Sequence, residues 1–221
     1  MRLLVVDAAL ACANVALVED DRVVAARFSA ERTGLAGQLP VMLVEVLGEA
    51  GLRVEDCDGI AVTVGPGSFT GIRAALALGE GLALASGKTL VPVSVGEAMH
   101  QALPHLGVRR LWTAIDSRRG HVFVETDEGC ASLAVGELPR PEGPVAVAGD
   151  AAIEVTARLA ARGYNVMLTD ARRPTPRAIA AAAGLRMRGE LPVRGVAPVY
   201  VDPPEARLPA GGLRPAPVSP P

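Results

Sequence analysis

The spacing of apolar residues predicts seven elements within the first hundred residues, in the order strand, strand, strand, helix, strand, helix, strand. The expected strands are Leu3 to Asp7, Asn14 to Glu19, Arg22 to Phe28, Gly59 to Val64 and Thr89 to Val95. The expected helices run from about Leu39 to Ala50 and from Ile72 to Ala85. Pro40 should lie in the opening turn of the first helix and Gly51 should end it, since proline suits helix starts and glycine suits helix stops.

A shortened copy of this pattern follows in the second half of the chain. Its expected strands are Leu111 to Asp116, His121 to Thr126, Val145 to Ala148 and Asn165 to Leu168, and its expected helices are Ala151 to Arg162 and Thr175 to Met187. Each half carries an aspartate, Asp7 or Asp116, at the end of its first strand. We therefore predict an α/β protein with one half at 1–100, a shortened second half at 101–201 and a Pro-rich extended tail at 202–221.

Both helices of the first half carry more apolar surface than one contact with a sheet requires. On the first helix one apolar face is already complete, and Val41, Val44 and Gly48 form a second stripe on roughly the opposite side. On the second helix Gly71, Ala75 and Gly79 lie four residues apart and form a smooth ridge. Two interpretations remain open: the helices pack on each other and on the sheet, or these six residues form a protein–protein interface, which we favour.

A glycine-rich segment joins the strand at Gly59 to Val64 to the second helix. Glycines at such a turn let backbone N–H groups approach an anion, and an arginine in the first helical turn adds a guanidinium. The other interpretation is an ordinary helix start, in which a Ser or Thr side chain caps the helix. The segment is neither a Walker A loop nor a dinucleotide fingerprint. The residues of this candidate nucleotide or helix-start site are Gly65, Pro66, Gly67, Ser68, Thr70, Gly71 and Arg73.

Composition narrows the function classes further. The formal net charge is −2 and aromatic residues make up 3% of the chain, so neither the positive charge nor the stacking surface of an autonomous nucleic-acid binder is present. No uninterrupted apolar run reaches the roughly 18 residues of a membrane span, and Asp7 follows the N-terminus too closely for a signal peptide. We therefore expect a cytoplasmic protein that does not contact the membrane.

No metal site or nucleophile is expected from the histidines and cysteines. His100, His105 and His121 have no metal-ligand spacing, and the cysteines at 12, 57 and 130 are scattered. Ser68 and Thr70 have no evident histidine partner, so we interpret them as hydrogen-bonding residues of the helix start. In the second hairpin turn, residues 116–119, two interpretations stay open: Arg118 and Arg119 are solvated, or one of them meets tRNA, a nucleotide or a partner carboxylate.

With these features together, the chain resembles the TsaB (YeaZ) family, bacterial proteins needed to make threonylcarbamoyladenosine at position 37 of tRNA. The nine residues from Gly65 to Arg73 match the family's hallmark segment throughout. The resemblance covers residues 1 to about 202. Further agreement lies in Asp7, Leu39–Pro40, Gly81–Leu82–Ala83, Ile115–Asp116 with Arg118 and Gly120, and Pro198–Val199–Tyr200–Val201. The chain departs from the family at Ala8, Gly34 and His121, which puts ligand roles at Asp7, Gly34 and His121 in doubt.

The resemblance implies the fold of actin, sugar kinases and Hsp70, with two RNase H-like halves, and a non-catalytic subunit that requires no cofactor of its own. It implies a heterodimer with the catalytic TsaD-like paralogue, docking of a TsaE-like ATPase, a nucleotide at the partner interface, and tRNA held mainly through the complex. Asp7 is followed by Ala8, Ala9, Leu10 and Ala11, so the phosphate loop of active kinases is missing. The alternatives are a nucleotide-dependent kinase, a glycoprotease-like peptidase, or a homodimer that uses the same helices.

Overall fold

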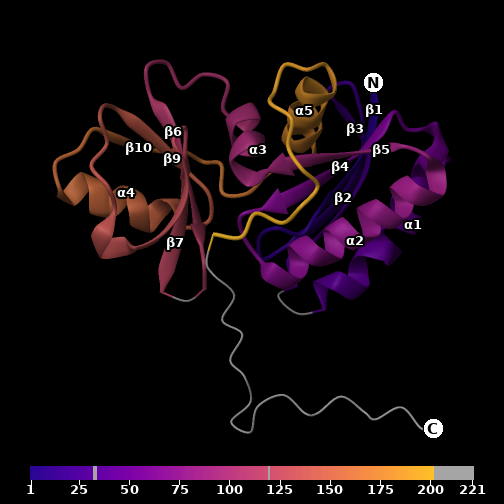
Figure 1. Cartoon of the computed structure of the whole chain (residues 1–221), viewed down its shortest axis with the longest axis horizontal. Helices are drawn as coiled ribbons and strands as arrows, with labels where there is room; N and C mark the ends of the chain where they lie inside the picture. The colour runs from indigo at the N-terminus through magenta and orange to yellow at the C-terminus, as the bar shows by residue number, and fades with distance from the viewer. Residues whose placement is uncertain (32–33, 119, 202–221) are drawn as a thin grey trace, which may run out of the picture.

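The first half of the chain forms a five-stranded mixed sheet. The computed structural model describes residues 1–31, 34–118 and 120–201. The strands are β1 (Arg2–Asp7), β2 (Ala13–Glu19), β3 (Arg22–Ser29), β4 (Gly59–Gly65) and β5 (Thr89–Ser94). Their order is β3-β2-β1-β4-β5; β1 pairs antiparallel with β2 and parallel with β4, so the hairpin strands form one edge and the parallel strands the other (Figure 1).

The second half repeats this sheet with shorter parallel strands. It contains β6 (Arg110–Asp116), β7 (His121–Thr126), β8 (Gly129–Ala134), β9 (Val145–Ala148) and β10 (Val166–Leu168). The order β10-β9-β6-β7-β8 has the same directions as the first sheet, because β6 pairs antiparallel with β7 and parallel with β9. The predicted α/β fold of two RNase H-like halves, the second shortened, is confirmed. Strand β8 was not expected, since its small and polar residues are only half-buried at most and show no clear alternation.

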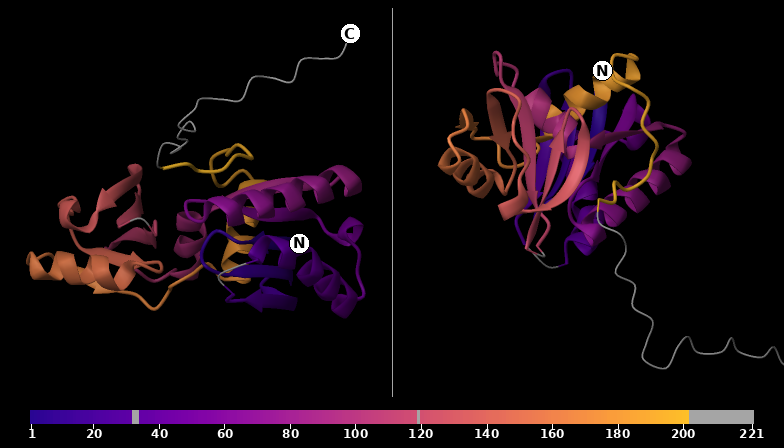
Figure 2. Two further views of the ribbon diagram at one scale, coloured as in Figure 1. Left: turned by 90° about the horizontal axis from the view of Figure 1, so that it is seen from below. Right: turned by 60° about the vertical axis from the view of Figure 1, so that its left-hand side comes forward.

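Helices cover both faces of the first sheet, and the two halves lie side by side (Figures 1 and 2). The helices are α1 (Leu35–Ala50), α2 (Phe69–Ser86), α3 (Val95–Ala102), α4 (Ala152–Ala161) and α5 (Pro176–Met187), with single 3₁₀ turns at Val54–Asp56 and Val135–Glu137. Alternate residues of β1 point to opposite layers: Leu4 and Val6 pack under α1 and α2, whereas Leu3 and Val5 pack under α5. Helix α4 covers the second sheet.

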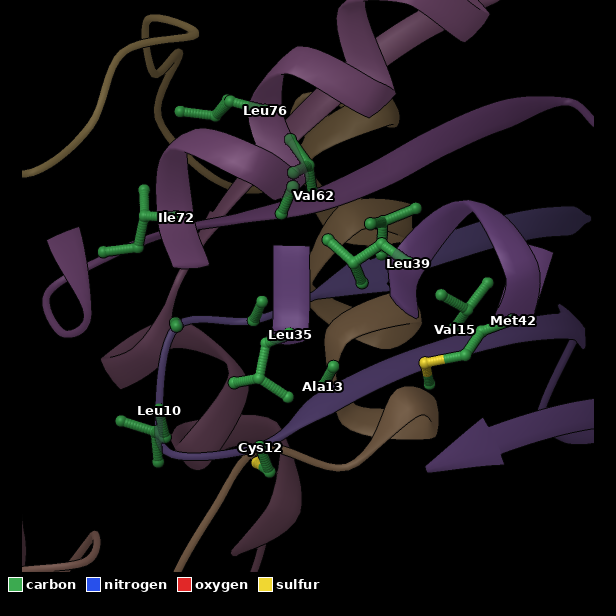
Figure 3. Close-up of a cluster of buried hydrophobic side chains, with 14 of the residues drawn as sticks. Leu10, Cys12, Ala13, Val15, Leu35, Leu39, Met42, Val62, Ile72 and Leu76 are labelled. Atoms are coloured by element: carbon green, nitrogen blue, oxygen red, sulfur yellow. The ribbon is translucent and has the colours of Figure 1, made fainter. Parts of the chain in front are cut away.

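The largest buried cluster lies between the first sheet and the helices α1 and α2 (Figure 3). The predicted inner face of α1 is confirmed, because Leu39, Met42, Leu43 and Val46 are buried. Burying one such side chain contributes about 1.5–3 kcal/mol, so this face holds α1 on the sheet. Within the described residues, no helix has the length and apolar character needed to cross a membrane.

The helices differ from the prediction at the starts of α1 and α2 and by the presence of α3. Helix α2 begins at Phe69, three residues before the expected Ile72. Helix α1 begins at Leu35, so Pro40 lies inside the helix and not in its first turn; the reason is that Leu35, four residues before Leu39, extends the buried stripe. The predicted stop at Gly51 is confirmed by its left-handed conformation, φ 65°. Helix α3 was not expected, because its eight residues are too few to show a helical period.

Helix α5 packs on the first sheet and on α3, although it comes from the second half of the sequence (Figure 1). Ile179 and Ala183 of α5 are buried together with Leu3 and Val5 of β1. The division of the chain at residue 100 stays a prediction, and the predicted Pro-rich tail at 202–221 lies outside the described residues.

Candidate functional site

The glycine-rich segment packs directly on the turn between β1 and β2. A Cβ atom on Gly67 would lie 2.0 Å from the Ala9 carbonyl oxygen, and one on Gly71 would lie 2.0 Å from the Ala8 carbonyl oxygen. The Ser68 N–H donates to the same Ala9 oxygen at 2.6 Å. These positions must therefore be glycine because the backbone of residues 8–9 occupies the space that a side chain would need.

The same segment starts α2 by ordinary capping. Ser68 has extended backbone angles, and its Oγ accepts a hydrogen bond from the Gly71 N–H at 3.2 Å. The Ile72 N–H donates to the Ser68 carbonyl at 2.9 Å, which closes the first turn, and Thr70 is exposed. Since the Ser68 N–H is already paired with Ala9, the geometry favours the helix-start interpretation. Nucleotide binding at Gly65 to Arg73 stays a prediction.

Arg73 is held by two aromatic rings. Its Nε donates to the Tyr200 hydroxyl at 2.9 Å, and its Cζ lies 3.7 Å from the centroid of the Phe69 ring and 5.5 Å from that of Tyr200. Residues 198–201, which we call the C-terminal strap, reach this point because the Val199 N–H donates to the Val64 carbonyl at 2.8 Å. The strap thereby covers Gly65, whose added Cβ would lie 3.4 Å from the Val199 carbonyl.

Asp7 is buried, and both of its carboxylate oxygens accept hydrogen bonds from the protein. It accepts hydrogen bonds from the Ala9 N–H at 3.0 Å, Asn14 Nδ2 at 3.0 Å and the Thr63 hydroxyl at 2.5 Å. Burial raises the pKa of Asp7, while these three donors act in the opposite direction. Asn14 and Thr63 were missed by sequence reasoning, although polar residues inside two apolar strands are the signal that would have identified them.

The corresponding turn of the second half is open to solvent. The Asp116 N–H donates to Asp150 Oδ1 at 2.9 Å, and the Arg118 N–H donates to Asp116 Oδ1 at 2.7 Å. Burial raises the pKa of Asp150, and the charge of Asp116 adds to that rise. Arg118 has a left-handed backbone, φ 62°, and Arg119 lies outside the described residues.

The positions that depart from the family pattern lie in three different segments of the chain. Ala8 is buried beneath Gly71, Gly34 precedes α1 with a left-handed backbone, and His121 begins β7 at the surface.

Among the described residues, no three His, Cys, Asp or Glu side chains lie close enough together to hold a metal ion. The cysteines are free thiols, and Cys12 and Cys57 are buried. Burial raises the pKa of Cys12 to about 11 and that of Cys130 to about 12, so both are poor nucleophiles at neutral pH.

The predicted interface residues divide into two groups. Val41 and Val44 are 59% and 71% exposed, and Gly48 is exposed beside them on α1. Gly71, Ala75 and Gly79 are buried: an added Cβ on Gly79 would lie 2.9 Å from Leu90 Cδ1. These three residues face the protein's own core, so they do not belong to the expected interface. The interface predicted for Val41, Val44 and Gly48 of α1 stays a prediction. The exposed face of α2 carries Phe69, Arg73, Ala77, Glu80 and Leu84.

A polar joint between the two halves was also missed by sequence reasoning. Glu125 of β7 accepts from the Ser94 hydroxyl at 2.8 Å and from the Gly96 N–H at 2.9 Å, so a carboxylate of the second half caps α3 of the first. Burial raises the pKa of Glu125. Glu97 of α3 pairs with Arg186 of α5 at 2.5 Å and with Arg194 at 3.1 Å. A pocket of about 260 Å³ lies beside this joint, and Glu97 and Glu125 line it.

Comparisons with known proteins agree with one another. Residues 33–168 match the family model described as TsaD, tRNA N6-adenosine threonylcarbamoyltransferase. The chain is 36% identical over 124 residues to the tRNA threonylcarbamoyladenosine biosynthesis protein TsaB of Escherichia coli, a match that covers 56% of this chain and 53% of that protein. The chain thus spans about half the length of the curated relatives it matches. YeaZ from Pseudomonas aeruginosa has the same fold, with a TM-score of 0.69 and 26% identity over 90% of this chain and 100% of that one.

Proposed function

This chain belongs to the TsaD family and is a TsaB (YeaZ) member of it, and we therefore propose that it is a non-catalytic partner subunit in the synthesis of N6-threonylcarbamoyladenosine on tRNA. Its partner is the TsaD-like paralogue, which performs the transfer, and a TsaE-like ATPase docks on the pair. The tRNA is held mainly by the complex, in the cytoplasm. A nucleotide, where one is required, lies at the interface with the paralogue.

The observation that carries this proposal is the exposed apolar stripe of α1. Val41 and Val44 project from a helix whose opposite face is already buried, and Gly48 continues the stripe. Helix α2 lies directly beside α1 and presents Leu84, which is 89% exposed (Figure 1). Two adjacent helices with apolar residues directed outward are typical of a helical protein–protein interface.

The closed first hairpin supports a role without catalysis. Ala8 and Ala9 press against Gly71 and Gly67, and the Asp7 carboxylate already accepts three hydrogen bonds. The turn in which a kinase would hold phosphate is thus filled by contacts of Ala8 and Ala9 with the rest of the chain. The rival function, a nucleotide-dependent kinase or a glycoprotease-like peptidase, predicts ATP or peptide turnover by the purified chain that is lost on Asp7→Asn.

The decisive experiment mixes the purified chain with the purified TsaD homologue from the same genome and measures mass by light scattering after size exclusion. We expect a mixed complex that Val44→Asp weakens about a hundredfold or more, because the substitution buries an unpaired charge. The matched control is Val108→Asp, at a side chain that is 88% exposed and outside α1 and α2, which should leave the complex intact. No mixed complex with wild-type protein, or modified tRNA in a strain that lacks this chain, would refute the proposed function.

A further inference from the structure

The guanidinium group of Arg73 is held in place, but within residues 1–31, 34–118 and 120–201 it has no anionic partner. Phe69 and Tyr200 hold it by ring contacts, and the Tyr200 hydroxyl accepts from Nε at 2.9 Å. Both rings are 53% exposed, and their centroids lie 6.0 Å apart. Among the described residues Arg73 forms no salt bridge and neither Nη group donates a hydrogen bond, so a rigid cation is presented at the surface.

We propose that Arg73 determines partner specificity by binding a carboxylate of the protein that docks on α1 and α2, an inference that rests on the proposed function. A guanidinium offers its two Nη groups as a fork that matches a carboxylate with two hydrogen bonds. The aromatic rings and the Tyr200 hydroxyl hold the fork in place before binding, so less side-chain entropy is lost when the partner arrives. The surrounding apolar residues exclude water and strengthen the charge pair.

The exposed face of α2 defines what the partner must present. Arg73, Ala77, Glu80 and Leu84 follow one another at spacings of four, three and four residues and therefore share one face. On this face Ala77 separates the cation of Arg73 from the anion of Glu80, and the apolar Leu84 follows Glu80. The complementary partner is a helix with a carboxylate opposite Arg73, a cation opposite Glu80 and an apolar residue opposite Leu84.

Nucleic acid is a poorer match for this face. Glu80 would repel a phosphate backbone that approaches Arg73 along α2, and Val41 and Val44 on the adjacent helix offer phosphate no hydrogen-bond donor. The aromatic rings are already in contact with the guanidinium. A protein helix satisfies the cation, the anion and the apolar positions together, so a protein carboxylate is the ligand that fits.

The C-terminal strap is part of this surface. Tyr200 reaches Arg73 because the neighbouring Val199 N–H is bonded to the Val64 carbonyl at 2.8 Å. The end of the second half therefore completes a binding face that is otherwise formed by helices of the first. Removing the Tyr200 hydroxyl should loosen the guanidinium without removing either ring contact.

The test measures the Kd between the full chain and the purified TsaD homologue by calorimetry at two salt concentrations. We expect Arg73→Gln to weaken binding about thirtyfold, as for the loss of one member of an interfacial charge pair, and to reduce the salt dependence of Kd. Arg73→Lys should lose most of this affinity, because an ammonium group cannot form the fork. Tyr200→Phe should weaken binding about threefold. The control is Arg177→Gln on α5, which packs on the other face of the sheet, and it should leave the Kd unchanged.

The outcomes separate this inference from the proposed function. If Val44→Asp abolishes the complex while Arg73→Gln keeps the wild-type Kd and salt dependence, the role of Arg73 is overturned and the proposed function stands. The role is equally overturned if Arg73→Gln affects only tRNA binding, measured by gel shift, or only self-association of the chain, measured by light scattering. If Arg73→Gln lowers the melting temperature enough to obscure binding, Tyr200→Phe decides: an unchanged Kd and salt dependence overturns the inference.

Discussion

The two halves of this protein share one strand order but differ at the turn that follows their first strand. In the first half Asp7 is buried and accepts three hydrogen bonds, whereas in the second half Asp116 is exposed and meets Asp150 through its backbone N–H. Both halves nevertheless press a glycine against a backbone carbonyl. Gly67 presses on the Ala9 carbonyl after β1 and Gly149 presses on the Ala114 carbonyl within β6. In the first turn, the Asp7 carboxylate is in addition bonded to groups of the chain itself.

The largest expected effect comes from filling that close contact. A Cβ on Gly67 would lie 2.0 Å from the Ala9 oxygen, and one on Gly149 would lie 2.0 Å from the Ala114 oxygen. Because backbone must move in either case, Gly67→Ala and Gly149→Ala should each cost more than about 3 kcal/mol. Urea unfolding followed by circular dichroism measures this, and where two transitions appear, each substitution should lower the midpoint of its own half.

Gly37 in α1 supplies the matched control for both substitutions. An added Cβ there meets no atom within 4 Å, so Gly37→Ala should be neutral or stabilise the protein by up to about 1 kcal/mol. A cost for Gly149→Ala as small as that for Gly37→Ala would show that only the first half depends on its glycine contact.

The second prediction concerns the ion pair that holds α5 against α3. Arg186 and Glu97 have side chains that are 8% and 17% exposed. Burial opposes ionisation of Glu97, but the Arg186 hydrogen bond, the Ser94 N–H and the charges of Arg194 and Arg186 lower its pKa. Arg186→Met should therefore cost about 3 kcal/mol at neutral pH, because the carboxylate loses its main partner.

The pH dependence of this pair has a definite sign. A carboxyl group whose folded pKa is lowered stabilises the protein above its unfolded pKa and loses that stabilisation as the pH falls through the folded pKa. The free energy of unfolding should fall in acid for the wild type and fall less for Arg186→Met. The control is Arg188→Met, whose pair with Glu190 is more than half exposed and should give no resolvable change. Equal effects of the two variants would contradict a special role for the buried pair.

Local sequence signals were sufficient to predict most of the first sheet but not the contacts between segments that are far apart in the chain. The apolar runs of β1 and β4 and the stop at Gly51 depend on nearby residues, and all were predicted. The contact of Gly67 with Ala9 joins two segments that are far apart in the chain, and no local pattern reports it. For the same reason, the residue spacing predicted that Gly71 lies on a partner surface, whereas in the structure Gly71 packs on Ala8.

Helix α3, which sequence reasoning missed, shows a further limit. Its start is marked by a capping box in which the Ser94 side chain accepts from the Glu97 N–H and Glu97 accepts from the Ser94 N–H. The cap is readable from the sequence, but the helix is too short for its apolar face to be recognised. Its anchoring by Glu125 depends on the second half of the chain and so required the structure.

The smallest expected effect tests the comparison of the two aspartates. Burial raises the pKa of Asp7, so this carboxyl favours folding fully below its unfolded pKa, which is near 4, and that contribution is lost as the pH rises through the folded value. At neutral pH the ionised group is therefore a burden. Asp7→Asn should raise the free energy of unfolding at pH 7 by about 1 kcal/mol, if the Asn14 amide rotates to offer its oxygen, and should flatten the pH profile.

Asp116→Asn in the second half is the control for Asp7→Asn. Because Asp116 is exposed, this substitution should change the free energy of unfolding by no more than about 0.5 kcal/mol. Chemical denaturation at several pH values measures both variants. A loss of about 2 kcal/mol for Asp7→Asn at pH 7 would mean that the donors from Ala9, Asn14 and Thr63 outweigh burial and stabilise a carboxylate. The first turn would then hold a charged aspartate at the end of β1, closed off from solvent by Ala8 and Ala9.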